Sequence, residues 1–230
     1  MTISGLVGRD ASVQPALVLP AGVRAVVFDV VGTLVEPHPS VALAYQAAAA
    51  RHGVERDAGE IGRRFHQAWR RQEALDATAA SPFVTDRARE QARWRAIVDE
   101  VFADCSETPA IFADLWEHFG RPAAWRPTAQ GPGLVRQALD AGPAVALASN
   151  FDERLHAIAG CVEPLSLVPH VFASSELGWR KPAVEFFRRI EERIDHDPSE
   201  LMIIGDDPEL DIAAGRRAGW HVHPVGRQSP

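Results

Sequence analysis

Cysteine is scarce in this 230-residue sequence, which has only Cys105 and Cys161, far apart and in no metal-binding spacing. This excludes a disulfide scaffold and a cysteine-based zinc site, and it is typical of free thiols in a reducing cytoplasm. No apolar run approaches the ~20 residues needed to span a bilayer. Residues 1–20 also lack the continuous apolar stretch of a signal peptide. We therefore expect a cytoplasmic protein with no membrane contact.

Lysine is even scarcer relative to arginine: of 24 basic residues, Lys181 is the one lysine. The net charge of −7 and the pI near 5.7 argue against a nucleic-acid partner, because nucleic acids attract basic surfaces. A compact ammonium is suited to a position between a carboxylate and a phosphate oxygen. Lys181 is therefore a candidate site residue, with a chance surface lysine as the alternative.

Short apolar runs predict the strands of a buried sheet, and amphipathic stretches predict helices between them. The predicted strands cover residues 23–28, 144–148, 171–173, 201–204 and 220–225. Between the first two strands, the pattern is helical only. The predicted helices there run from an N-cap at Ser40 to Arg51, with Gly53 as the stop signal, and over residues 59–77, 86–103 and 107–119.

Strands alternating with helices predict an α/β fold with a doubly wound parallel sheet, and the helical block predicts an inserted all-helical cap. We expect a core domain of residues 1–36 and 126–230 and a cap of residues 37–125. Residues 1–20 are expected to form a flexible extension, with an oligomer contact as the alternative.

Three predicted strands end in residues with useful chemistry, at the sheet edge where such folds bind ligands. Asp29 follows the first strand and could act as a nucleophile, although an isolated aspartate is more often a helix or turn cap. The pair Asp206 and Asp207 follows another strand and calls for a cation such as Mg²⁺. Asp211, one helical turn further, could orient the metal ligands without binding the metal itself.

A third strand is followed by Ser149 and Asn150, whose hydroxyl and amide groups could bind a phosphoryl group or a carboxylate. The alternative is that the Ser-Asn pair caps a helix.

Taken in order, these segments resemble the four motifs of the haloacid dehalogenase (HAD) superfamily, from about Val23 to the end of the chain. The matching segments are FDVVGTL at 28–34, ASNFD at 148–152, GWRKP at 178–182 and IGDD at 204–207, extending to Asp211. The helical insertion directly after the first motif resembles the cap of subfamily I. The second and third motifs are most similar to the rhythmically-expressed-gene branch.

The resemblance implies a role for each matching residue. Asp29 is then the nucleophile and a magnesium ligand, and Asp206 and the backbone carbonyl of Val31 are further metal ligands. Ser149 is implied to bind the phosphoryl group, and Lys181 to steady both nucleophile and phosphate.

The sequence departs from the family pattern at Val31, where phosphatases of this superfamily have a second aspartate that acts as general acid and base. Such catalysis contributes roughly 10²- to 10⁴-fold to the rate, so we expect slow hydrolysis, least slowed for aryl or acyl phosphates. Asp207, Glu36 and His38 are candidate substitutes. Glu36 and His38 begin the linker to the cap, where they are more often solvated hinge residues.

The favoured function is magnesium-dependent hydrolysis of a small, anionic phosphorylated metabolite by a monomer or homodimer. One alternative is a catalytically reduced relative that binds metal and phosphate. A haloacid dehalogenase fits less well, because those enzymes work without magnesium and the pair Asp206 and Asp207 calls for a cation. A Schiff-base phosphonate hydrolase is excluded, because the predicted cap contains no lysine.

Overall fold

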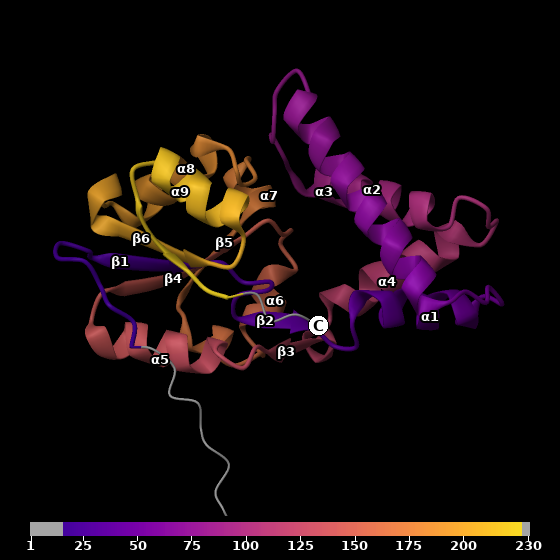
Figure 1. Ribbon diagram of the computed structural model, residues 1–230, viewed down its shortest axis with the longest axis horizontal. Helices are drawn as coiled ribbons and strands as arrows, with labels where there is room; N and C mark the ends of the chain where they lie inside the picture. Colours follow the sequence, from indigo (N-terminus) through magenta and orange to yellow (C-terminus); the bar gives the residue numbers. More distant parts are fainter. Residues whose placement is uncertain (1–15, 227–230) are drawn as a thin grey trace, which may run out of the picture.

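The computed structural model describes residues 16–226 and is built around a five-stranded sheet (Figure 1). The strand order is β5-β4-β1-β6-β7, and all neighbouring strands are parallel. The five strands are β1 (Ala25–Phe28), β4 (Ala144–Ser149), β5 (His170–Ala173), β6 (Leu201–Gly205) and β7 (His221–Pro224). The five strands predicted from the sequence are confirmed, each within two residues at either end.

Helices cover both faces of this sheet, as in a doubly wound fold (Figure 1). Successive residues of a strand point to opposite faces. On β1, Val26 and Phe28 therefore pack in one apolar cluster and Ala25 and Val27 in another. The helices on the first face are α5 (Gly131–Ala141) and α6 (Leu155–Ala159); those on the second are α7 (Ser174–Leu177), α8 (Val184–Ile194) and α9 (Ala214–Arg217).

A block of four helices extends from the sheet domain and has its own apolar core (Figure 1). The helices are α1 (Val41–Arg51), α2 (Ala58–Thr78), α3 (Arg87–Val101) and α4 (Thr108–Gly120). They match the four predicted helices closely. Ser40 does occupy the N-cap position of α1, but its side chain makes no capping hydrogen bond there. We refer to residues 38–124 as the helical block.

The two connections between the sheet domain and the helical block run side by side. They form an antiparallel pair, β2 (Val35–Pro37) with β3 (Trp125–Pro127), which the sequence patterns did not indicate. Short helical turns occur at η1 (Pro122–Ala124), η2 (Leu165–Leu167) and η3 (Pro198–Glu200), and a π-helix, η4, at Pro208–Ala213.

Of the extension predicted at residues 1–20, residues 1–15 lie outside the part that the structure describes. Leu17 and Leu19 pack against the first apolar cluster, and the amide of Leu17 donates a hydrogen bond to Gln137 Oε1 at 2.6 Å. Among the described residues, no helix is both long enough and apolar enough to cross a membrane.

Candidate functional site

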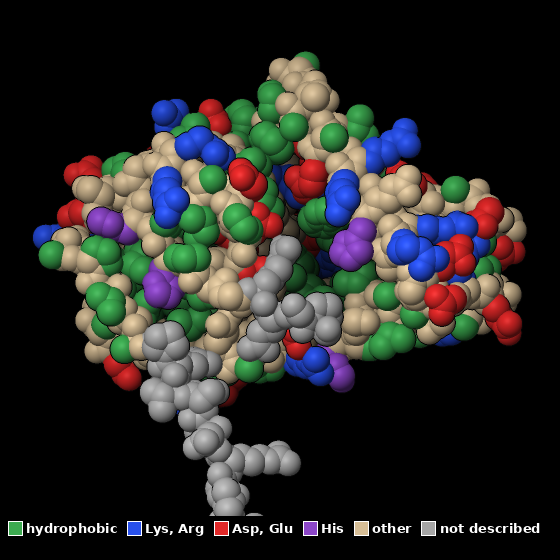
Figure 2. Space-filling model, in the orientation of Figure 1, with side chains coloured by type: hydrophobic (Ala, Val, Ile, Leu, Met, Phe, Trp, Pro, Cys, Tyr) green, Lys and Arg blue, Asp and Glu red, His purple; other side chains and the backbone are tan. Residues whose placement is uncertain are grey.

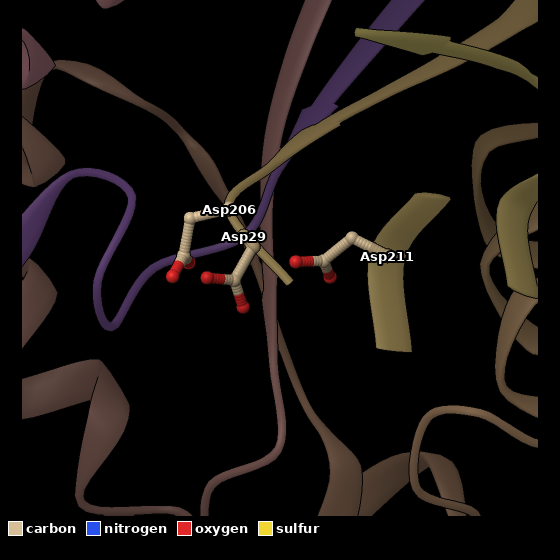
Figure 3. A group of neighbouring side chains, drawn as sticks. All are labelled: Asp29, Asp206 and Asp211. Carbon is tan, nitrogen blue, oxygen red and sulfur yellow. The ribbon is translucent and has the colours of Figure 1, made fainter. Parts of the chain in front are cut away.

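Three neighbouring strands bring the predicted site residues to one edge of the sheet. In the order β4-β1-β6, Ser149 is the last residue of β4, and Asp29 and Asp206 directly follow β1 and β6. Parallel strands end at the same edge, so these three residues reach one edge of the sheet although Asp29 is more than a hundred residues away from the other two in the sequence. Figure 3 shows that the carboxylates of Asp29, Asp206 and Asp211 converge.

The Asp29 carboxylate is buried and held from two sides. Its Oδ1 atom accepts a hydrogen bond from Lys181 Nζ at 2.7 Å, and its Oδ2 atom accepts one from the Thr33 hydroxyl at 3.0 Å. The side chain is largely shielded from water, since the residue is only 6% exposed. Its orientation is therefore fixed before any substrate binds, as a nucleophile requires.

Thr33 joins two of the three carboxylates. Its hydroxyl lies 2.9 Å from Asp206 Oδ1 and accepts the backbone N–H of Asp206 at 3.1 Å. Because a hydroxyl has one proton, it can donate to Asp29 or to Asp206 at a given moment, but not to both. Thr33 belongs to the first motif, but the sequence alone assigned it no role. The signal was a hydroxyl residue directly after the Gly32 turn.

Lys181 is buried, and its ammonium bridges two carboxylates. Besides Asp29, it contacts Asp211 Oδ1 at 2.6 Å. The backbone of Lys181 is clamped by the Asn150 amide, which accepts the Lys181 N–H at 2.8 Å and donates to the Lys181 carbonyl at 2.9 Å. The Asn150 amide thus supports the lysine segment, and its binding of phosphate stays a prediction. Ser149 is buried at the end of β4.

The segment after β6 places Asp211 against Lys181. Asp207 lies at the start of the π-helix η4, where its Oδ1 atom accepts the amides of Glu209 and Leu210 at 2.9 and 3.0 Å. Asp211 Oδ2 accepts the Asp207 amide at 3.0 Å. Asp211 contacts Lys181 and belongs to the carboxylate cluster, and its role in orienting the metal ligands stays a prediction.

The other two candidate acids, Glu36 and His38, are held by a residue of the neighbouring strand. Arg126 donates to Glu36 Oε1 at 2.8 Å, and its Nη1 atom lies 3.2 Å from His38 Nδ1. All three side chains belong to the β2-β3 connection or its end, and both contacts lie in exposed surroundings. This geometry is that of a solvated linker.

The electrostatics of the site follow from three neighbouring carboxylates, two of which contact the Lys181 ammonium. Burial raises the pKa of Asp29 to about 7; Lys181 opposes this rise, and the carboxylates of Asp211 and Asp206 add to it. Burial by itself would lower the pKa of Lys181, but Asp211 and Asp29 raise it above its ordinary value. The lysine therefore stays charged.

The cluster is suited to a divalent cation. One carboxylate oxygen from each of Asp29, Asp206 and Asp211 lies within 4.8 Å of the others. Two like charges 4 Å apart repel by about 4 kcal/mol at an effective dielectric constant of about 20, so a cation would relieve a large cost. Oxygen ligands of this kind fit Mg²⁺. The Val31 carbonyl as a further ligand stays a prediction.

A glycine makes room for the acidic cluster. Gly32 has a φ of +95°, and a Cβ atom built on it would lie 2.8 Å from both carboxylate oxygens of Asp206. Only glycine allows both this backbone conformation and this close approach. The first motif therefore supplies, besides the nucleophile, the space in which the Asp206 carboxylate sits.

The surface in Figure 2 mixes basic and acidic side chains, and blue and red patches alternate over the helical block. No broad basic area appears on this face. The expectation of a small anionic substrate, without nucleic acid, stays a prediction.

A family model and similar curated proteins point to the same family. A family model described as haloacid dehalogenase-like hydrolase matches residues 23–219. The chain is 26% identical to haloacid dehalogenase-like hydrolase domain-containing protein 3 of Bos taurus, over 90% of this chain and 83% of that protein. It is 24% identical to the Rhythmically expressed gene 2 protein of Drosophila melanogaster, over 90% of this chain and 84% of that protein.

Solved structures share the same fold. A defluorinating L-2-haloacid dehalogenase superposes with a TM-score of 0.70 at 21% identity, covering 89% of this chain and 82% of that one. A Bacillus subtilis protein classed as a HAD-hydrolase, in a structure bound to magnesium, gives a TM-score of 0.62 at 19% identity, with 87% of each chain covered. The resemblance to the rhythmically-expressed-gene branch, made on the second and third motifs, is confirmed by the relatives.

Proposed function

Because this chain belongs to the haloacid dehalogenase-like hydrolase family, we propose that it hydrolyses a small phosphorylated metabolite with Mg²⁺, through an aspartyl phosphate on Asp29. The observation that carries the proposal is the cluster of Asp29, Asp206 and Asp211, in which the buried ammonium of Lys181 contacts Asp29 and Asp211. Mg²⁺ characteristically binds through one or two carboxylates together with substrate phosphate oxygens.

In this proposal, Asp29 and Asp206 hold the metal ion together with the Val31 carbonyl. When bound, Mg²⁺ neutralises charge on the transferring phosphoryl group and orients it. Asp211 lies within reach of the same site. Its Oδ1 atom contacts Lys181, so its main role is to place that ammonium.

The protein's own groups carry out the two displacements. A carboxylate oxygen of Asp29 attacks phosphorus, and the bond from phosphorus to the leaving oxygen breaks. Water then attacks the aspartyl phosphate, which releases inorganic phosphate and restores the Asp29 carboxylate. Lys181 lies 2.7 Å from Asp29, so its ammonium compensates charge on both the nucleophile and the phosphoryl oxygens. Ser149, buried at the end of β4, is the proposed hydroxyl donor to the phosphoryl group.

Position 31 decides which substrates react well. Val31 can neither protonate the leaving oxygen nor activate the water, and the absence of such a group costs roughly 10²- to 10⁴-fold. Leaving groups that depart without a proton need this help least. We therefore propose that aryl or acyl phosphates are turned over faster than alkyl phosphates.

A series of aryl and alkyl phosphate esters of graded leaving-group pKa tests this directly, with inorganic phosphate measured in Mg²⁺ and in chelator. The proposal expects Mg²⁺-dependent release that falls steeply as the leaving-group pKa rises. Equal rates across the series would contradict the missing-acid account, and no release from any ester would contradict hydrolysis.

Val31 also favours a second candidate: a relative that keeps metal and phosphate binding but has lost turnover. This candidate expects Mg²⁺-dependent binding of inorganic phosphate with no hydrolysis of any ester. A dehalogenase would release halide from short 2-haloacids without Mg²⁺, and a halide assay on the same preparation tests that reading.

A further inference from the structure

The residue before the buried lysine, Arg180, is itself buried and reaches into the helical block. Its side chain is 3% exposed. Its guanidinium contacts three carboxylates, two from α2 and one from α3. These contacts are Nη1 to Asp76 Oδ2 at 2.8 Å, Nη2 to Glu73 Oε1 at 3.3 Å and Nε to Glu90 Oε1 at 3.4 Å.

A second buried arginine, Arg93 of α3, shares these partners. It contacts Glu73 Oε1 at 2.6 Å and also Asp76, and its side chain is 6% exposed. Glu90 is 2% exposed and accepts a hydrogen bond from the Thr85 hydroxyl at 2.8 Å. We call Glu73, Asp76, Glu90, Arg93 and Arg180 the latch network. Arg180 is its member from the sheet domain, and the other four come from the helical block.

The backbone around Arg180 is attached to the helical block as well. The loop between α2 and α3 pairs with the segment that carries the lysine, through an isolated antiparallel bridge between Val84 and Trp179. Two backbone hydrogen bonds flank this bridge: the Thr85 amide donates to the Gly178 carbonyl at 3.0 Å, and the Arg180 amide donates to the Phe83 carbonyl at 2.9 Å. The lysine segment therefore lies between the helical block on one side and the Asn150 clamp on the other.

We propose that Arg180 is a positioning residue, which couples the docking of the helical block to the placement of the Lys181 ammonium. Consecutive residues of one short segment are fixed by different domains. Arg180 is held by the latch network, and the Lys181 backbone is held by Asn150. If the helical block moves away, its carboxylates either carry Arg180 with them or leave its guanidinium without its ion-pair partners, and either event shifts the adjacent lysine.

The consequence for catalysis rests on the proposed function, because the proposed function makes Lys181 a catalytic residue. The mechanical coupling between the helical block and Lys181 does not depend on that function. A displacement of about 1 Å at a reacting group can cost about 10²-fold in rate. Docking of the helical block would then set the position of Lys181.

The composition of the chain offers a direct measurement, because Lys181 is its one lysine. Acylation of the lysine amine by acetic anhydride, followed by mass spectrometry of the peptide that contains Lys181, reports how often this ammonium leaves its buried site. A short lysine-containing peptide in the same tube gives the rate for a free amine. The measurement uses the whole protein and needs no turnover.

Two variants test the coupling. Arg180→Met removes the link from the sheet-domain side. Glu73→Gln combined with Asp76→Asn weakens it from the helical block, at residues that do not contact Lys181. The matched control is Arg64→Met, which removes contacts to Asp104 within the helical block at 3.1 Å.

Loss of a charge-assisted hydrogen bond shifts a local opening equilibrium by about tenfold or more. Both latch variants are therefore expected to raise the Lys181 labelling rate by at least about tenfold, below the thermal transition of each protein. The control is expected to keep the native rate. A residue with a merely structural role would lower the thermal transition and leave the labelling rate unchanged.

A native labelling rate in folded Arg180→Met would overturn the proposal, and so would an equal rise in the Arg64→Met control. If Arg180→Met does not fold, the double variant decides in the same way. Failure of the coupling and failure of the proposed function are distinguishable, because the second is measured as phosphate release by the native protein.

Discussion

Replacing Lys181 with methionine removes the ammonium that contacts both Asp29 and Asp211, while keeping an unbranched chain of similar length. Asp29 and Asp211 are 6% and 1% exposed, so water cannot take over the role of the lysine. The three carboxylates of the cluster are then left together without this compensation.

Removing one partner of a buried ion pair typically costs about 3–5 kcal/mol of folding free energy. We expect a loss of this size at pH 8 in chelator. Lys181 lowers the pKa of Asp29 in the native protein, so its loss raises the folded-state pKa of Asp29 further above the unfolded value, and the folded protein takes up a proton that the unfolded chain does not. The free energy of unfolding of the variant therefore recovers as the pH falls through this range, and the loss relative to the native protein shrinks at pH 5.5.

Urea denaturation of both proteins at pH 8 and pH 5.5 measures these quantities. Mg²⁺ at 100 times its dissociation constant should return about 2.7 kcal/mol. The control is Arg189→Met, which removes an ion pair to Glu192 whose two side chains are 51% and 61% exposed; such a pair contributes at most about 1 kcal/mol. A loss at pH 8 no larger than that of the control, or a loss independent of pH, would refute the reasoning.

Three further changes have defined outcomes. Gly32→Ala places a methyl group 2.8 Å from the Asp206 carboxylate at a φ of +95°. It should weaken Mg²⁺ binding at least about tenfold by calorimetry, since a strained backbone of this kind alone costs about 1–3 kcal/mol. Unchanged affinity would contradict the role of Gly32 in making room for the Asp206 carboxylate. Because burial raises the pKa of Asp29 to about 7, a proton competes with the metal below that pH. The rise in melting temperature with Mg²⁺ should therefore grow from pH 5.5 to pH 8, and a shift independent of pH would argue against Asp29 as a ligand. Arg154→Met leaves the fully buried Asp152 carboxylate without its paired guanidinium and should lower the free energy of unfolding by about 3 kcal/mol in urea; a loss under 1 kcal/mol would contradict the assigned pair.

The fold was predictable because each strand carries its own signal. The apolar runs before Asp29 and Asp206 are fully buried strands, and burial on both faces is why they read as continuous apolar segments. The β2-β3 pair was not predictable, because strands of three residues with proline leave no periodicity to detect. Their pairing comes from tertiary contact between distant segments.

The site was predictable in its members, but less so in their roles. Asp29, Lys181 and Asp206 lie together as the motifs imply. The contact between Asp211 and Lys181 depends on the π-helix η4, in which one extra residue per turn changes where side chains point.

The latch network was beyond sequence reasoning for another reason. Arginines and acids of an amphipathic helix look alike whether they face solvent or another domain. The arginine-rich pattern of α2 and α3 therefore gave no sign that Arg93 is buried and shares its carboxylate partners with Arg180, whereas nearby arginines of α3 are exposed.

The central claim is that Asp29 is a nucleophile in a magnesium phosphatase that lacks its general acid at position 31. The most direct test is phosphate release from p-nitrophenyl phosphate and from an alkyl phosphate, in Mg²⁺ and in chelator, by the native protein, Asp29→Asn and Val31→Asp. The account predicts Mg²⁺-dependent turnover of the aryl ester that Asp29→Asn abolishes. It also predicts that Val31→Asp raises alkyl ester hydrolysis by roughly 10²-fold or more. Native turnover that survives Asp29→Asn, or no turnover in either the native protein or Val31→Asp, would contradict it.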